Sequence, residues 1–203
     1  MKTLNRDFYN RDSITVAKEL LGKMLVHETG GKRISAKIVE TEAYMGVIDK
    51  AAHSYGGKRT PRVEVMYGEP GHSYVYLIYG MYHCFNVVAG PQGVPQAVLI
   101  RALEPVEGLD MIAYNRYQKP YGELNKKQIT GLTSGPGKLC RAFLIDKELN
   151  GEDLCGSRLY VEEGETKGLS IVESRRVGID YAEEARDFLW RFYIEGNPYV
   201  SVK

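Results

Sequence analysis

The chain has little of what marks several common classes of protein. Its 203 residues include only three cysteines, and the odd, widely spaced set of Cys84, Cys140 and Cys155 predicts neither a disulfide framework nor a thiol-bound metal. The four scattered histidines predict no zinc site. The formal net charge is only +1, so the chain lacks the basic balance of a protein that binds nucleic acid through its overall field. Any nucleic-acid contact must therefore come from local clusters of charge.

Long hydrophobic runs are also missing. No apolar run approaches the length of a membrane span, and the sequence turns polar directly after Met1 without an apolar targeting segment. The hydrophobic content of 43% over 203 residues is enough for one sizeable core. We therefore expect a soluble cytoplasmic protein with a single domain, residues 1–203.

The segment 37–44, Lys-Ile-Val-Glu-Thr-Glu-Ala-Tyr, is the most informative part of the chain. In a β-strand, the period of two places Glu40, Glu42 and Tyr44 on one face together with Ile38. Carboxylates rarely lie within a strand this apolar unless another group pairs with them or uses them. Taken alone, however, the pattern favours an exposed strand whose polar face is solvated.

A second segment changes that interpretation. Residues 97–103, Ala-Val-Leu-Ile-Arg-Ala-Leu, predict a central strand with one guanidinium in its middle. Because a buried arginine requires a carboxylate partner, Arg101 predicts that Glu42 or Glu40 lies inside the protein.

Two aromatic, β-branched runs at 73–78 and 82–88 predict a hairpin with Tyr79-Gly80-Met81 at its tip. Hairpin tips are normally small and polar, whereas Tyr79, Met81 and Tyr82 would form an exposed apolar knob. Such a knob can pack on a neighbouring loop, mark a dimer contact, or act as a wedge between base pairs.

Two short segments combine glycine with positive charge. Residues 54–62 carry Lys58, Arg59 and Arg62 beside two adjacent glycines, which suits a phosphate contact and a solvated loop equally well. Residues 134–138, Ser-Gly-Pro-Gly-Lys, lack the spacing and the following Ser or Thr of a nucleotide-hydrolysing phosphate loop. They predict a helix start at which Lys138 and free amides could hold a phosphate, although a plain capped helix fits as well.

The remaining pattern predicts ordinary scaffold. The expected elements are a helix at 14–21 capped by Asp12 or Ser13, strands at 23–27 and 33–44, a helix at 105–117, a surface loop at 118–128, a helix at 136–144 capped by Ser134, strands at 158–162 and 169–172, a basic spot at 174–178, a short helix at 182–189 and a strand at 191–194.

Several motifs taken together resemble one protein family. They are Glu-Ala-Tyr at 42–44, Ala-Ala-His-Ser at 51–54, the tyrosine-rich hairpin at 74–82, Arg-Ala-Leu-Glu-Pro at 101–105, Ser-Gly-Pro at 134–136, Arg-Val-Gly at 176–178 and Gly-Asn-Pro at 196–198. In this order and spacing, from the first helix to the C-terminus, they closely resemble the alkyladenine (3-methyladenine) DNA glycosylase family. The resemblance implies a mixed α/β domain with a largely antiparallel, curved sheet, surrounding helices and a hairpin protruding toward DNA.

The resemblance also implies an activity. Family members are monofunctional base-excision repair enzymes that flip damaged purines out of duplex DNA. The damaged purines are alkylated, deaminated or etheno-purines. By resemblance, Glu42 is the general base that activates a water, which Arg101 and the backbone carbonyl of Val177 hold in place. Hydrolysis of the N-glycosidic bond then leaves an abasic site.

The remaining site residues are likewise assigned by resemblance. Tyr44 and Tyr76 would sandwich the flipped purine, the His53 amide would meet its edge, and Asn86 would face the position of a guanine 2-amino group. At the hairpin, the residues implied to contact DNA are Tyr79, which would fill the gap in the duplex, and Met81 and Tyr82, which would widen the groove.

The expected partner is double-stranded DNA with damaged purines. We expect a bacterial-type monomer that acts on the nucleoid, and we expect it to need neither a cofactor nor a metal. No lysine stands in the apparent pocket and no proline follows Met1, so strand-cleaving lyase chemistry is not suggested. Two alternatives rank lower. One is a damaged-DNA-binding module that does not cut, and the other is an inverting sugar hydrolase using Glu40 and Glu42.

Overall fold

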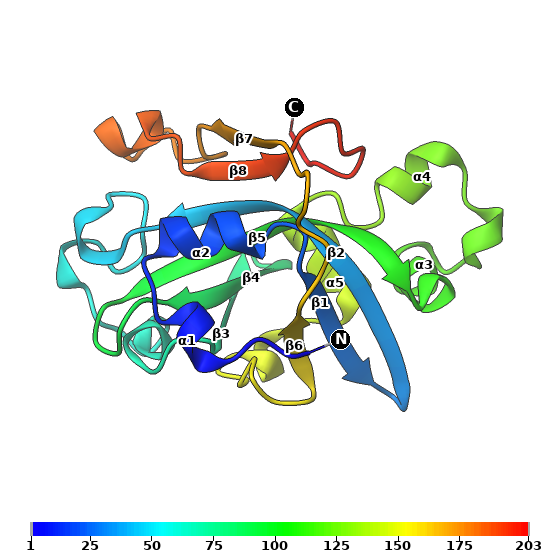
Figure 1. Ribbon diagram of the computed structural model, residues 1–203, viewed down its shortest axis with the longest axis horizontal. Coiled ribbons are helices and arrows are strands. Elements are labelled where there is room, and N and C mark those ends of the chain that lie inside the picture. Colours follow the sequence, from blue (N-terminus) through cyan, green and yellow to red (C-terminus); the bar gives the residue numbers. More distant parts are fainter. Residues whose placement is uncertain (1, 203) are drawn as a thin grey trace.

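A curved antiparallel β-sheet organises the protein. The computed structural model describes residues 2–202, and its main sheet has the strand order β3-β4-β5-β2-β1-β6, with β8 added to β2 and β7 added to β8 (Figure 1). The strands are β1 (Met24–Thr29), β2 (Lys32–Tyr44), β3 (Ser73–Ile78), β4 (Tyr82–Ala89), β5 (Gln96–Glu107), β6 (Leu159–Glu162), β7 (Ile171–Ser174) and β8 (Arg191–Ile194). The predicted mixed α/β class with a largely antiparallel, curved sheet is confirmed.

Short helices pack around this sheet. They are α1 (Arg6–Tyr9), α2 (Ser13–Leu20), α3 (Leu109–Tyr117), α4 (Lys126–Thr130) and α5 (Pro136–Phe143). Helix α2 begins after Asp12, whose side chain accepts a hydrogen bond from the Thr15 amide, and it ends where Gly22 adopts a positive φ of 86°. Helix α2 packs on β2 and β5, whereas α5 packs on β4 and β5. No helix within residues 2–202 is long and apolar enough to cross a membrane.

Three local predictions are wrong: a helix start, a loop and a helix cap. The helix expected from residue 105 begins only at Leu109, because β5 continues through Glu107 and Gly108 then turns the chain with a φ of 72°. The expected loop at 118–128 instead contains a short 3-10 turn and the start of α4, which is capped by Asn125. Ser134 does not cap α5, whose N-cap is Gly135 without a side-chain hydrogen bond.

The other elements agree with the sequence pattern to within a few residues. The strand at 191–194 is found as predicted, and the short helix expected at 182–189 is a 3-10 helix, Glu183–Asp187. Helix α1 was not predicted, because four residues carry no readable period.

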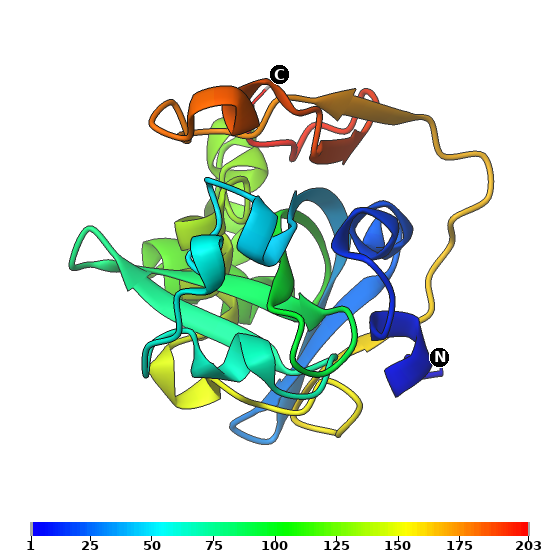
Figure 2. The same cartoon turned by 90° about the vertical axis from the view of Figure 1, so that its left-hand side faces the viewer.

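The predicted hairpin is present. Ile78 pairs with Tyr82, and Tyr79 at the tip has a φ of 53°, which is uncommon for a residue other than glycine. Figure 2 shows β3 and β4 extending together away from the body of the protein, with the tip at its outer edge.

The pairing of β2 with β5 is irregular beside the two glutamates. Ile38 pairs with Leu103 and Glu40 with Ala102, so Val39 is an extra residue on β2; Thr41 then pairs with Ile100, so Arg101 is an extra residue on β5. Such bulges re-aim side chains next to functional sites. Both glutamates are fully buried, so the alternative of a solvated strand face at 37–44 is wrong.

Candidate active site

A cavity of about 590 Å³ lies where the sheet, the hairpin and the start of α5 meet. Residues from β2, β3, β4 and β5 form its walls, and the segment 177–181 closes one side. Its aromatic lining consists of Tyr44, His53, Tyr74, Tyr76, Tyr79, Tyr82 and Tyr181. A mostly preformed cavity with aromatic walls and a few polar groups is typical of a ligand site.

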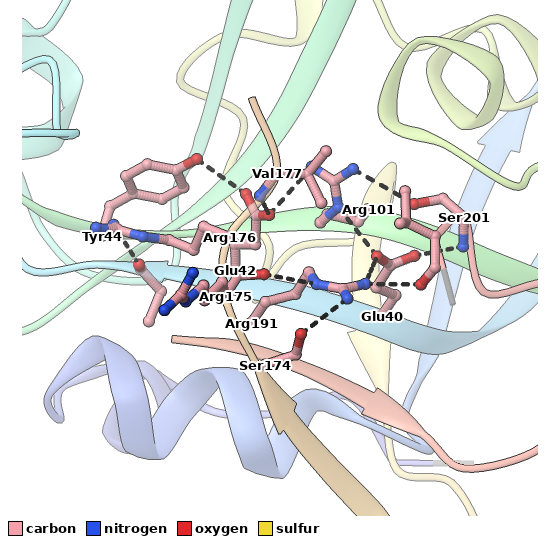
Figure 3. Close-up of polar contacts among 12 residues, drawn as sticks. Glu40, Glu42, Tyr44, Arg101, Ser174, Arg175, Arg176, Val177, Arg191 and Ser201 are labelled. Atoms are coloured by element: carbon pink, nitrogen blue, oxygen red, sulfur yellow. Dashed lines mark hydrogen bonds and ion pairs between the residues drawn. The ribbon is translucent and has the colours of Figure 1, made fainter. Parts of the chain in front are cut away.

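Glu42 lies directly behind this lining. Its Oε1 accepts a hydrogen bond from the Val177 amide at 2.7 Å and lies 3.2 Å from Arg101 Nη1. Its Oε2 accepts the hydroxyl of Tyr44 at 2.9 Å (Figure 3). Burial and the neighbouring Glu42 carboxylate raise the pKa of Tyr44, so the phenol remains a donor. Glu42 is thus held from three sides by groups that border the cavity.

Arg101 connects Glu42 to a second carboxylate. Its Nε donates to Glu40 Oε1 at 3.1 Å while Nη1 faces Glu42. Burial lowers the pKa of Arg101, but the charges of Glu42 and Glu40 outweigh this effect and raise it. Both glutamates that the sequence offered as partners of Arg101 therefore contact it.

Glu40 has a structural environment and does not border the cavity. Its Oε1 also accepts Arg191 Nη1 at 2.8 Å, and its Oε2 accepts the Ser201 amide at 2.6 Å. These contacts give Glu40 a structural role.

Of the two arginines in the predicted basic spot at 174–178, Arg175 is exposed and Arg176 is buried. Arg176 is not on the surface; it forms a fully buried ion pair with Asp49, with Nη1 and Nη2 at 2.5 and 2.8 Å from the carboxylate. Its guanidinium also stacks 4.8 Å from the ring centre of Tyr44 and 5.0 Å from that of Trp190. Asp49 and Arg176 therefore support the Tyr44 wall of the cavity.

The opposite group of predicted pocket residues also comes together. His53 Nδ1 lies 2.8 Å from the Tyr74 hydroxyl, and its ring centre lies 4.7 Å from that of Tyr76. Burial, with the charges of Arg62 and Lys58, lowers the pKa of His53 to about 4, so the imidazole is neutral near pH 7. Asn86 lines the cavity and donates to the Tyr74 carbonyl at 3.0 Å.

The hairpin tip forms the exposed rim. Tyr79 is 82% exposed, Met81 68% and Tyr82 47%, and both tyrosines border the cavity while Met81 lies outside the lining. Gly137 of α5 packs against the Tyr82 ring, where an added Cβ would lie only 3.1 Å away.

Positive side chains lie around the cavity. Lys138 lines it together with Arg116 and Arg141, and within residues 2–202 none of these three is paired with a carboxylate. Burial, with the nearby charge of Arg141, lowers the pKa of Arg116. Two close, uncompensated guanidinium groups of this kind attract an anion.

The three cations predicted to contact phosphate in the loop 54–62 have different surroundings. Arg62 lies 4.8 Å from the ring centre of Tyr76, outside the cavity lining, and Lys58 is exposed. Arg59 pairs with Glu64 through two hydrogen bonds and is therefore a weaker phosphate candidate than the other two.

Sequence reasoning missed Arg191, Ser201, Arg116, Arg141 and Tyr181. A signal existed for Arg191, which opens the apolar run Arg-Phe-Tyr-Ile at 191–194 as Arg101 interrupts its own run. The others come from segments whose meeting depends on long-range packing, and no local pattern marks them.

Comparison with known proteins identifies the family. Residues 7–198 match the family model described as Methylpurine-DNA glycosylase (MPG). The chain belongs to the methylpurine-DNA glycosylase family. It is accordingly a DNA glycosylase, a DNA-repair hydrolase acting on N-glycosyl bonds.

Bacterial relatives support this membership over the full length. The chain is 69% identical to a protein of Desulfitobacterium hafniense (strain Y51) named "Putative 3-methyladenine DNA glycosylase", with 100% of both chains covered. A Clostridium acetobutylicum protein of the same name is 59% identical over 98% of this chain and 97% of its own. One from Clostridium tetani is 58% identical over 98% of this chain and 99% of its own.

Proposed function

We propose that this glycosylase flips a damaged purine out of duplex DNA into the aromatic cavity and hydrolyses its N-glycosidic bond with a water activated by Glu42. The observation that carries this proposal is the position of Glu42. It is a buried carboxylate held behind the cavity lining by Arg101, Tyr44 and the Val177 amide. The product is an abasic site.

The contacts of Glu42 leave it an acceptor position for a water. An ionised carboxylate has about four acceptor positions, and three donors occupy Glu42. The fourth position can accept the proton of the attacking water, and the Val177 carbonyl and Arg101 are the proposed groups that orient it. As the base departs, positive charge develops on the sugar, and the anionic Glu42 stabilises this charge while it takes the proton.

The cavity walls supply the proposed base recognition. Stacking contributes roughly 1–3 kcal/mol per base, so a purine between Tyr44 and Tyr76 regains much of the few kcal/mol that flipping costs. The His53 amide is proposed to meet the purine edge, and Asn86 to face the position of a guanine 2-amino group. Cationic N-alkylpurines gain a cation–π attraction to the tyrosine rings. Deaminated and etheno-purines are neutral, so their departure also needs a proton donor.

The rim supplies the proposed DNA contacts. Tyr79 is proposed to fill the gap left in the duplex, with Met81 and Tyr82 widening the groove beside it. Lys58, Arg62 and Lys138 are proposed to contact backbone phosphates, and Arg116 and Arg141 extend this positive surface along the cavity. The enzyme is proposed to act as a monomer.

The two alternatives are less favoured by the same contacts. A module that only binds damage has no use for a carboxylate held at the cavity by three donors. An inverting sugar hydrolase needs two carboxylates on opposite sides of the bond, whereas Glu40 lies outside the cavity and is bound to Arg101, Arg191 and Ser201.

The test is direct excision. Purified protein is incubated in EDTA with labelled duplexes that each carry one lesion, 7-methylguanine, hypoxanthine or ethenoadenine, and abasic sites are then cleaved with alkali. We expect a lesion-dependent product with at least one of these duplexes and none with undamaged DNA. Release of no base from any duplex would contradict the proposed function.

A further inference from the structure

Glu42, behind the cavity lining, is one end of a chain of four buried charges. Glu42 Oε1 lies 3.2 Å from Arg101 Nη1, and Arg101 Nε lies 3.1 Å from Glu40 Oε1. The same Glu40 oxygen accepts Arg191 Nη1 at 2.8 Å, so negative and positive groups alternate from Glu42 to Arg191 (Figure 3). The exposed fractions of these side chains run from 0% to 8%.

Backbone groups fix the far end of this chain. The Ser201 amide donates to Glu40 Oε2 at 2.6 Å, and Arg101 Nη2 donates to the Ser201 hydroxyl at 3.3 Å. Arg191 donates from Nε to the Arg175 carbonyl at 2.9 Å and from Nη1 to the Val202 carbonyl at 2.9 Å. Neither Glu40 nor Arg191 is part of the cavity lining, so both act on the reaction indirectly, through Arg101 and through their charge on Glu42.

We propose that Glu40 and Arg191 are positioning residues that set how strongly Arg101 attracts the charge of Glu42. Arg101 is shared between two carboxylates, and Arg191 in turn offsets part of the charge of Glu40. This sharing orients Glu42 without committing the whole guanidinium to it. The proposal rests on the function proposed above, in which Glu42 is the base.

The proposal requires opposite effects from the two residues. Without the charge of Glu40, Arg101 acts on Glu42 alone and a repelling carboxylate is lost, so Glu42 should take up a proton only at lower pH. Without the charge of Arg191, Glu40 repels Glu42 more strongly, so Glu42 should take up a proton at higher pH. A role limited to holding the fold together gives no reason for shifts of opposite sign.

Other charged and titratable groups around Glu42 stay the same in both variants. The buried Arg176–Asp49 pair stacks behind Tyr44, and the surface pair Arg175–Asp187 lies further out. The neutral groups nearby are the Tyr44 and Tyr181 phenols and the Cys84 thiol, whose pKa values burial raises in all three cases.

The experiment is a pH–rate profile under single-turnover conditions on a duplex with one 7-methylguanine. This base is already cationic, so its departure does not depend on an added proton. We expect the acid limb of the profile to move down by about one pH unit in Glu40→Gln and up by a similar amount in Arg191→Gln. Arg191→Lys retains the charge and should restore the wild-type limb.

Glu162→Gln is the matched control. Glu162 is a buried glutamate at the end of β6. It pairs with Arg33 and lies outside the cavity lining. Its replacement removes the same charge from a pair with a partly exposed arginine, so it should lower stability and leave the acid limb unchanged. Unshifted limbs in Glu40→Gln and Arg191→Gln, with losses of stability like that of Glu162→Gln, would overturn the proposal.

A second measurement separates this proposal from the proposed function. The ¹³C resonance of the Glu42 carboxylate, assigned by its loss in Glu42→Gln, is titrated in wild type and in each variant without DNA. Opposite displacements of its titration support the proposal even if no lesion is excised, in which case the proposed function alone fails. If Glu40→Gln does not fold, Arg191→Gln decides: an upward displacement supports the proposal and an unchanged titration overturns it.

Discussion

The buried charges behind the cavity and the rim of the cavity are built on different principles. The buried charges, called the floor from here on, are Glu40, Glu42, Arg101 and Arg191, and each is bound by other groups of the protein. At the rim, Tyr79 projects an aromatic ring into solvent.

In the proposed mechanism, this difference separates chemistry from recognition. Buried polar groups must be satisfied within the protein, so the floor is organised before any substrate arrives and loses little energy in reorganisation during the reaction. An exposed apolar knob beside unpaired cations, in contrast, has its partners outside the molecule. Substitutions at the floor should therefore alter catalysis or stability, and substitutions at the rim should alter binding.

The strongest test of the floor is Glu42→Gln. We expect excision to slow by about 10³-fold or more, because the amide cannot take a proton from water or stabilise positive charge on the sugar. Binding to a lesion-containing duplex, measured by fluorescence anisotropy, should stay within a few-fold of wild type. A near-normal excision rate would remove Glu42 from the role of base.

The second test breaks the buried ion pair behind Tyr44. Arg176→Met leaves Asp49 buried without its partner and should lower the free energy of unfolding by about 3–5 kcal/mol, measured by urea denaturation. Arg59→Met, which breaks an exposed pair with Glu64, is the control and should change stability little. Equal losses in the two variants would contradict the distinction between interior and surface.

At the rim, Tyr79→Ala should weaken binding to an abasic-site duplex by about 1–3 kcal/mol, because the stacked ring is lost. The free energy of unfolding should hardly change, since the side chain is 82% exposed. Tyr79→Phe keeps the ring and should bind as wild type does. Unchanged affinity of the alanine variant would exclude the wedge.

The smallest expected effect is on the pH dependence of stability. It comes from His53, which lies between the floor and the rim. His53 has a pKa of about 4 when folded against an ordinary value of 6.5, so the unfolded chain takes up its proton first as pH falls. The stability that neutral His53 provides is present above pH 6.5 and is lost progressively toward pH 4. His53→Gln should therefore show a weaker fall in unfolding free energy between pH 7 and 4.5, and an unchanged slope would contradict the assignment.

The sequence predicted the parts of the site that leave a local pattern. An arginine within an apolar strand indicated a buried carboxylate, and the structure pairs Arg101 with Glu42 and Glu40. The aromatic hairpin was equally visible, because alternation and an unusual tip are properties of one segment.

Pairings between distant segments were not predictable in the same way. Arg176 follows another arginine and Asp49 precedes a lysine, so each resembles a solvated residue until the fold buries the two together. The helix α3 was predicted to begin too early because Pro105 suits a helix start, whereas its pairing with Ala36 prolongs β5. In both cases tertiary contacts overrode the local preference.

The long connection from β6 to β7, which crosses one side of the molecule in Figure 2, has a consequence for the order of synthesis. Every segment that completes the surroundings of Glu42 and Glu40 from beyond the main sheet follows this connection: Val177, Arg191 and Ser201. A chain emerging from the ribosome presents Glu42 and Arg101 first and supplies these partners last. If Glu42 is the base as proposed, a nascent chain carries this carboxylate in an unfinished setting, and it becomes competent to release a base only once residues 174–202 have folded onto β2.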